Sequence, residues 1–137
     1  MKILSIDYGD KRIGLAISDK NGKLASRFLM LENKSLKKSI VEIKKIITEK
    51  NIQKIIVGIP IGLRGESAQT KNIKEFSVKL SENISIPIIG MNEVFTSKMA
   101  EENLRKAGVK KEDIKKIIDQ EAARIILQDY LNRKLEN

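Results

Sequence analysis

The sequence predicts an α/β protein in which a five-stranded mixed sheet carries helices on both faces. Two observations lead to this prediction. The first 19 residues read as two short apolar strands around a tight polar turn. From residue 35 onward, helical periodicity alternates with short β-branched segments. The 137 residues, 41% hydrophobic and 33% charged, have the size and composition expected of one globular domain spanning residues 1–137.

The N-terminal segments predict an antiparallel meander. Lys2–Asp19 contains two strands joined at Gly9, a residue that can adopt turn conformations other residues resist. Asn21-Gly22 is a strong turn signal, and Leu24–Leu31 follows it as a third strand. Three consecutive strands with such short connections are expected to pair antiparallel.

The remaining segments alternate between helix and strand. Ser35 is a plausible N-cap for a helix with Leu36, Ile40, Ile43 and Ile47 on one face. Gly108 is expected to end a later helix. The other predicted elements are a strand at 52–59, a helix at 67–82, a strand at 84–90, a helix from 96 or 97 to 107, and a helix after 109–113 that ends near 133. The order is β-β-β-α-β-α-β-α-α, with the last two strands joined by parallel crossovers.

Cysteine and histidine are both missing, which limits the possible chemistry. A disulfide, a thiolate nucleophile and a thiolate metal site are excluded, and so is the commonest general base. A bound metal ion would need oxygen ligands, which favours Mg²⁺, Mn²⁺ or Ca²⁺. Because the sequence shows no membrane-spanning segment and starts directly with a strand, we expect a cytoplasmic protein.

The formal net charge is +9, with a sequence pI of about 9.7. For a small protein, this charge favours a polyanionic partner, most simply nucleic acid. AT-rich coding bias would also produce a chain rich in Lys, Ile and Asn. Charge alone therefore leaves the partner open.

Two acids stand at the carboxyl ends of predicted strands. Asp7 ends the first strand, and Glu93 follows the fifth. We expect strand four beside strand one and strand five beyond it, so both acids would reach the sheet edge where α/β proteins bind ligands. Burying a carboxylate is costly unless a cation meets it. Taken alone, Glu93 is better explained as a loop acid favoured by the dipole of the next helix.

A third acid, Asp119, lies on the apolar face of the last predicted helix. The residues three, four and seven positions onward are Ala122, Ala123 and Ile126, which share its face. The two alanines would let this helix approach the sheet closely. An acid on a core-facing stripe is more often a ligand or a paired group than a solvated one.

Three carboxylates from distant segments, without His or Cys, are typical of a site for one or two Mg²⁺ or Mn²⁺ ions. Glu121 and Asp129 lie off the apolar stripe and are expected to be ordinary surface charges. A metal ion held by these carboxylates, with basic residues around it to bind phosphate, would be suited to hydrolysing phosphodiester bonds. The sequence therefore predicts this reaction. The residues expected to contact nucleic acid are Lys11, Arg12, Arg64, Lys98, Lys110, Lys111, Lys115 and Lys116.

The segment 6–19 resembles the YqgF (RuvX) family, whose members begin with Asp-Tyr-Gly-x-Lys-Arg-x-Gly-x-Ala-x-Ser-Asp. Later segments agree in order and spacing: 56–60 with Gly65, Glu93 with Thr96-Ser97, and 119–128. The resemblance implies an RNase H-like fold related to resolvases of the RuvC type. It also implies a nuclease with acidic residues at Asp7, Glu93 and Asp119. The family's bacterial members are mostly described as nucleases processing the 5′ end of pre-16S ribosomal RNA, and earlier as Holliday-junction resolvases.

The chain departs from the family pattern around Glu93. The family usually has Asp-Glu-Arg where this chain has Asn92-Glu93-Val94. One carboxylate and one arginine are therefore missing, and weaker phosphate binding or slower cleavage would follow. Lys98 or Lys11 would be the nearest substitutes for the lost positive charge.

Two other functions compete with the nuclease. Sugar kinases and actin-like ATPases also open with an Asp-x-Gly hairpin, but they need a second domain that 137 residues cannot supply. A non-catalytic RNA- or junction-binding module would keep its affinity after loss of Asp7 and Asp119. We expect a monomer or a weak homodimer, and the sequence leaves precursor ribosomal RNA and branched DNA open as substrates.

Overall fold

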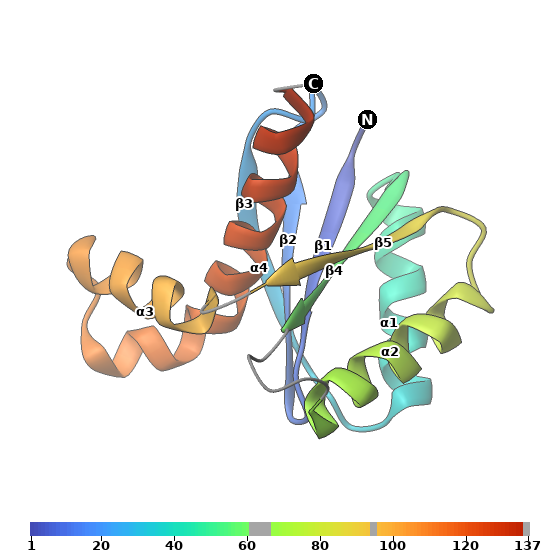
Figure 1. Ribbon diagram of the computed structural model, residues 1–137, viewed down its shortest axis with the longest axis horizontal. Coiled ribbons are helices and arrows are strands. Elements are labelled where there is room, and N and C mark those ends of the chain that lie inside the picture. Colours follow the sequence, from blue (N-terminus) through green and yellow to red (C-terminus); the bar gives the residue numbers. More distant parts are fainter. Residues whose placement is uncertain (61–66, 94–95, 136–137) are drawn as a thin grey trace.

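The computed structural model describes residues 1–60, 67–93 and 96–135, and within them five strands form one mixed sheet (Figure 1). The strand order is β3-β2-β1-β4-β5. Neighbours among β1, β2 and β3 are antiparallel, and β4 runs parallel to both β1 and β5. The strands are β1 (Ile3–Tyr8), β2 (Arg12–Ser18), β3 (Ala25–Glu32), β4 (Lys54–Pro60) and β5 (Ile88–Glu93). This is the predicted architecture.

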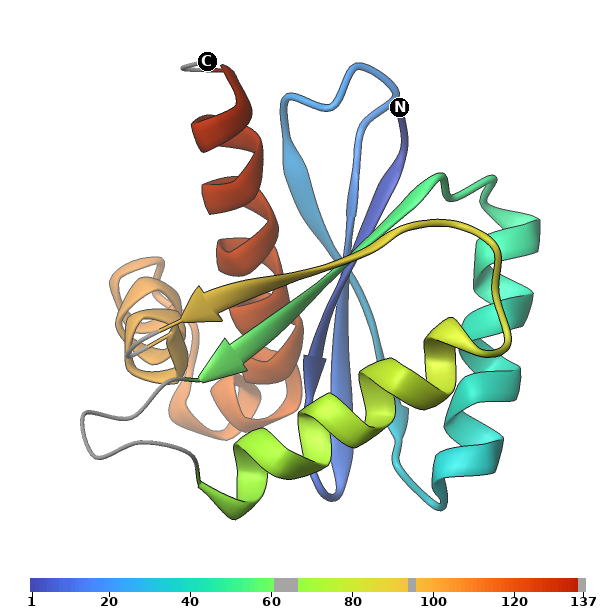
Figure 2. The same cartoon turned by 45° about the vertical axis from the view of Figure 1, so that its right-hand side comes forward.

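Helices cover the two faces of the sheet unequally, as Figures 1 and 2 show. One face carries α1 (Leu36–Glu49) and α2 (Ala68–Ser81), and the other carries α4 (Lys111–Leu135). The remaining helix, α3 (Thr96–Lys106), packs beside α4 rather than on the sheet. The predicted Ser35 cap is present, because its hydroxyl accepts a backbone hydrogen bond at the start of α1, and the Ser67 hydroxyl caps α2 in the same way.

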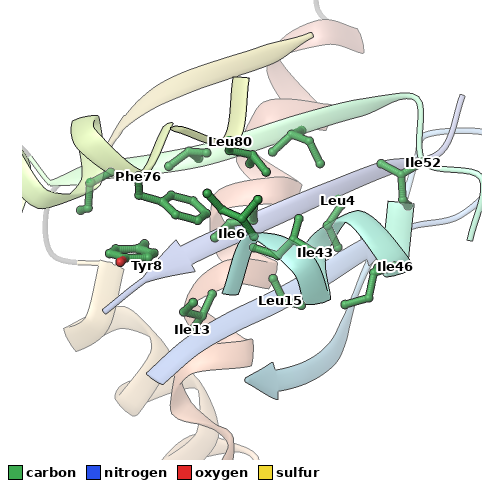
Figure 3. Packing of buried hydrophobic residues seen from close by; sticks show 14 residues of the cluster. Leu4, Ile6, Tyr8, Ile13, Leu15, Ile43, Ile46, Ile52, Phe76 and Leu80 are labelled. Atoms are coloured by element: carbon green, nitrogen blue, oxygen red, sulfur yellow. The ribbon is translucent and has the colours of Figure 1, made fainter. Parts of the chain in front are cut away.

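Alternation along β1 assigns its side chains to the two faces. Leu4, Ile6 and Tyr8 enter the core beneath α1 and α2, where the Tyr8 ring stacks on Phe76 with centroids 4.2 Å apart (Figure 3). Residues 3, 5 and 7 therefore face α4. Asp7 is thus directed toward the side of the sheet that α4 covers.

Small residues bring α4 very close to the sheet at this position. A Cβ on Gly14 would lie 2.0 Å from the backbone oxygen of Asp119, so only glycine fits. Gly14 is the residue paired with Asp7 across β1 and β2. Nearby, the Ser5 hydroxyl donates a 2.6 Å hydrogen bond to the Ala123 carbonyl. The predicted close approach of this helix is therefore confirmed, and it places Asp119 over Asp7.

The fifth strand differs from its predicted range of 84–90. It runs from Ile88 to Glu93, because Pro87 supplies a carbonyl to Ile55 but has no N–H for a ladder. Ile84 and Ile86 pack against the core without belonging to a strand. Consequently Glu93 ends a paired strand, opposite Pro60, instead of lying in a loop. None of the helices in the described ranges is long and apolar enough to cross a membrane.

The Gly14 contact predicts a large stability effect for one added methyl group. We expect Gly14→Ala to lower the free energy of unfolding by about 1–3 kcal/mol or more, because backbone must move to relieve the overlap. Gly90→Ala is the matched control, since its methyl would meet the flexible Ile59 Cδ1 at 2.6 Å. Urea unfolding measures both, and equal losses would contradict the close approach of α4.

Candidate active site

The carboxylate of Asp7 is largely buried at the carboxyl end of β1. Burial, together with the nearby charge of Asp119, raises the pKa of Asp7 to about 7. The two acids come from segments more than 100 residues apart and meet only because α4 lies directly on Gly14. Two carboxylates held together in a desolvated setting favour either a shared proton or a bound cation.

Asp119 is held by an arginine from the β1–β2 hairpin. Arg12 Nε donates a 2.9 Å hydrogen bond to Asp119 Oδ2, and the side chains are 53% and 21% exposed respectively. The arginine is thus accessible to solvent while its partner is mostly covered. The hairpin is itself ordered by the Gly9 N–H donating to the Arg12 carbonyl at 2.9 Å.

Glu93 lies on the same face of the sheet as Asp7. It shares this face with Met91, two residues earlier, which packs against α4. Its Oε2 accepts a 2.9 Å hydrogen bond from the Thr96 hydroxyl, whereas Oε1 is buried without a partner among the described residues. Burial raises the pKa of Glu93, Asp129 adds to the rise, and Thr96 and Arg133 oppose it.

The three predicted acids are therefore brought to one face, but not equally close together. Asp7 and Asp119 interact directly, whereas the charges acting on Glu93 are those of Asp129 and Arg133. Over residues 1–60, 67–93 and 96–135, no three acidic side chains are close enough to hold a metal ion together. The donor set still suits a hard cation, because it offers a carboxylate pair and an unpartnered, buried carboxylate oxygen.

The predicted basic residues fall into three groups, and among those that the structure describes only Arg12 has a contact with one of these acids. Lys11 and Arg12 lie exposed in the hairpin, and Lys98 is exposed on α3. The third group consists of the lysines that precede Asp119, which are Lys110, Lys111, Lys115 and Lys116. They are exposed on or just before the first turns of α4, where Lys116 pairs with Asp113 at 3.8 Å. Arg64 lies outside the described residues.

The expectation that Glu121 is a surface charge is wrong. It is only 3% exposed and accepts hydrogen bonds from Arg124 and, at 3.4 Å, from Asn103 of α3. Burial raises the pKa of Glu121, but its contacts with Arg124, Asn103 and Arg27 outweigh this and lower it. The acid joins α3 and β3 to α4. The Glu-x-x-Arg spacing was the available sequence signal, because it predicts an i,i+3 ion pair.

Comparisons with solved structures identify the fold as RNase H-like. Thermus thermophilus RuvC, solved in complex with a Holliday junction substrate, matches with a TM-score of 0.63 at 11% identity, covering 98% of this chain and 96% of that one. The fowlpox virus resolvase, solved with Holliday junction DNA, matches with a TM-score of 0.63 at 18% identity, covering 98% and 99%. The architecture is thus that of RuvC-like resolvases.

Sequence comparisons then assign the family. The model of the family described as "RuvX: Holliday junction resolvase" matches residues 1–133, so the chain belongs to the RuvX family. A relative from Chloroflexus aurantiacus is 38% identical over 136 residues, which cover 98% of this chain and 89% of the relative. One from Ruminiclostridium cellulolyticum is 39% identical over 135 residues, covering 97% and 95%. Both relatives carry the name "Putative pre-16S rRNA nuclease".

The raised pKa of Asp7 predicts how stability depends on pH. Between the usual value of 3.8 and about 7, native Asp7 binds a proton that the unfolded chain releases. The free energy of unfolding should therefore fall as pH rises through this window, by up to about 4 kcal/mol. Asp7→Asn should remove this decline when unfolding is measured in EDTA. Asp10→Asn, which changes an exposed acid of the same hairpin, should keep it, and a decline that survives Asp7→Asn would refute the assignment.

Proposed function

We propose that this protein is a cytoplasmic nuclease that hydrolyses phosphodiester bonds with Mg²⁺ or Mn²⁺, and that its substrate is precursor 16S ribosomal RNA. The observation that carries the proposal is the pairing of Asp7 with Asp119 in a largely buried setting. Such a pair is unfavourable when both groups are ionised, and a divalent cation would remove the penalty. The names of the relatives supply the RNA substrate.

Asp7 and Asp119 are the residues proposed to hold the metal, and Glu93 Oε1 is proposed to join them as a further ligand by a side-chain shift, since the three acids are not close enough together in the structure. This assignment is supported by the shared face of the sheet and by the buried, unpartnered oxygen of Glu93. When bound, one or two such ions would activate water and stabilise the leaving oxygen of the phosphodiester. Thr96 orients Glu93 through its hydroxyl, and thereby leaves Oε1 available.

The surrounding cations are proposed to position the substrate. Arg12 and Lys11 are exposed beside the acids, and α4 begins with exposed lysines at 111, 115 and 116. Arginine can donate two parallel hydrogen bonds to one phosphate group, so Arg12 is the strongest candidate for binding the phosphate of the bond that is cleaved. A monomer or weak homodimer would suffice for trimming RNA, whereas a symmetric junction would favour a dimer.

Cleavage by acid-to-amide variants tests the reaction directly. We expect Asp7→Asn to cut a 5′-labelled pre-16S precursor at least about 100-fold more slowly in Mg²⁺, because a direct ligand matters at least as much as an outer-shell group. RNA affinity should persist in this variant, and Asp10→Asn should cut at the native rate. Undiminished cleavage by Asp7→Asn would refute the mechanism.

The same assay separates the competing functions. A four-way DNA junction, compared with the ribosomal precursor at equal concentration, distinguishes a resolvase from an RNA-processing enzyme. Tight RNA binding by the native protein without cleavage of either substrate would instead favour the non-catalytic binding module.

The contact between Arg12 and Asp119 predicts an effect on metal binding. Arg12→Gln frees Asp119 Oδ2 and should tighten Mn²⁺ binding about two- to fivefold, in line with the free energy of an exposed ion pair. Lys11→Gln removes the same charge from the same hairpin and controls for long-range electrostatics. Electron paramagnetic resonance of free Mn²⁺ measures both variants, and equal affinities would show that Arg12 does not compete with the metal.

A further inference from the structure

A second cationic cluster lies at the opposite end of the sheet from the acids. Its centre is Tyr130 on α4, whose hydroxyl accepts a 3.0 Å hydrogen bond from Lys54 Nζ at the start of β4. Lys54 Nζ is also 5.6 Å from the centroid of the Tyr130 ring, and Lys134 Nζ is 5.9 Å from it. Two ammonium groups therefore gather around one aromatic side chain.

The cluster lacks a balancing acid among the described residues. The neighbouring carboxylate, Asp129, is already paired with Arg133 at 2.9 Å. Cation–π contacts stabilise each lysine by only about 0.5–1 kcal/mol at an exposed position, so both ammonium groups can still bind an anion.

Tyr130 is oriented so that it can contribute a donor. Because its oxygen accepts a hydrogen bond from Lys54, its own O–H remains available to donate, and no acceptor for it is found within the described parts of the chain. A phosphate oxygen would fit this donor, with an ammonium group on either side. The ring, which is partly exposed, offers an apolar surface beside them.

More positive charge continues around the same end of the sheet. A cavity of about 630 Å³ is lined there by the N-terminal residue and by Lys2, Lys20 and Lys50, with no acidic residue in its lining. The Met1 amine donates a 2.9 Å hydrogen bond to the Lys20 carbonyl, which fixes it at the rim. The cavity is lined by the end of α1 and so lies on the other face from Tyr130, and its lining residue Gln53, next to Lys54 in the chain, donates from its N–H to the Lys2 carbonyl at 2.9 Å.

The cluster is also placed within reach of the candidate active site. Lys54 is paired with Ile3, which precedes Asp7 by four residues on β1. The backbone positions of Lys54 and Asp7 are therefore about 13 Å apart along the strand direction. Both lie on the face that α4 covers, and α4 packs chiefly on β2 and β3. At about 3.4 Å per nucleotide of a stacked strand, some four nucleotides would connect the two positions.

We propose that Tyr130, Lys54 and Lys134 form a second binding site for the phosphodiester backbone of a nucleic-acid strand, about four nucleotides away from the cleaved bond. The site extends the proposed function by giving the substrate a second point of attachment. It does not depend on whether the strand is cut.

Salt-dependent binding of a labelled 20-nucleotide RNA tests this site. In a plot of log affinity against log salt concentration, the double variant Lys54→Gln/Lys134→Gln should have a slope that is less steep by about 1.4. Each lost contact with a phosphate of a single strand removes about 0.7 from the steepness. The same change corresponds to about 25-fold weaker binding at 0.1 M salt. The matched control is Lys71→Gln/Lys106→Gln, which removes two exposed lysines from α2 and α3 and should leave the slope unchanged.

Tyr130→Phe separates the hydroxyl from the ring. It should weaken RNA binding about three- to tenfold without changing the slope, because one hydrogen bond is lost but no cation. Each variant must retain cooperative thermal unfolding and native Mn²⁺ affinity, which shows that the carboxylate site is intact. Identical slopes for the two lysine doubles would overturn the proposal. Failure of the native protein to cleave RNA would refute only the proposed function, because these binding measurements would still decide this site.

Discussion

The contact between Gly14 and the backbone of Asp119 is the constraint on which the rest of the site depends. A side chain on residue 14 would overlap the Asp119 carbonyl, so α4 can reach β2 only over a glycine. Because Gly14 is paired with Asp7, this approach also sets two carboxylates together in a largely buried setting. The energetic cost of that placement is borne by the packing of α4 on the sheet, and a bound cation would relieve it.

Much of this arrangement could be predicted from the sequence because its signals are local. Turn residues and alternating hydrophobicity located the meander, and helical periodicity placed Asp119 on the same face as Ala122 and Ala123. The topology rules for α/β sheets then brought Asp7 to the correct edge. The family resemblance agreed with this order, and the match over residues 1–133 confirms it.

The remaining features depend on tertiary packing, which periodicity does not report. Ile84 and Ile86 look like strand residues because they are apolar and β-branched, yet they fill the core while Pro87 delays pairing until Ile88. The periodicity predicts one apolar stripe and therefore an exposed Glu121, but α4 is covered on two sides, by the sheet and by α3. A helix buried on two sides has room for a paired acid on its second face.

Asp7 and Asp119, with Glu93 on the same face, are the residues proposed to bind a divalent cation. The most direct measurement is anomalous diffraction at the manganese edge from crystals grown in Mn²⁺. We predict a peak in contact with carboxylate oxygens of Asp7 and Asp119, with the Glu93 side chain shifted toward the ion from its position beside Thr96. Manganese bound elsewhere, with Arg12 still on Asp119, would refute this site.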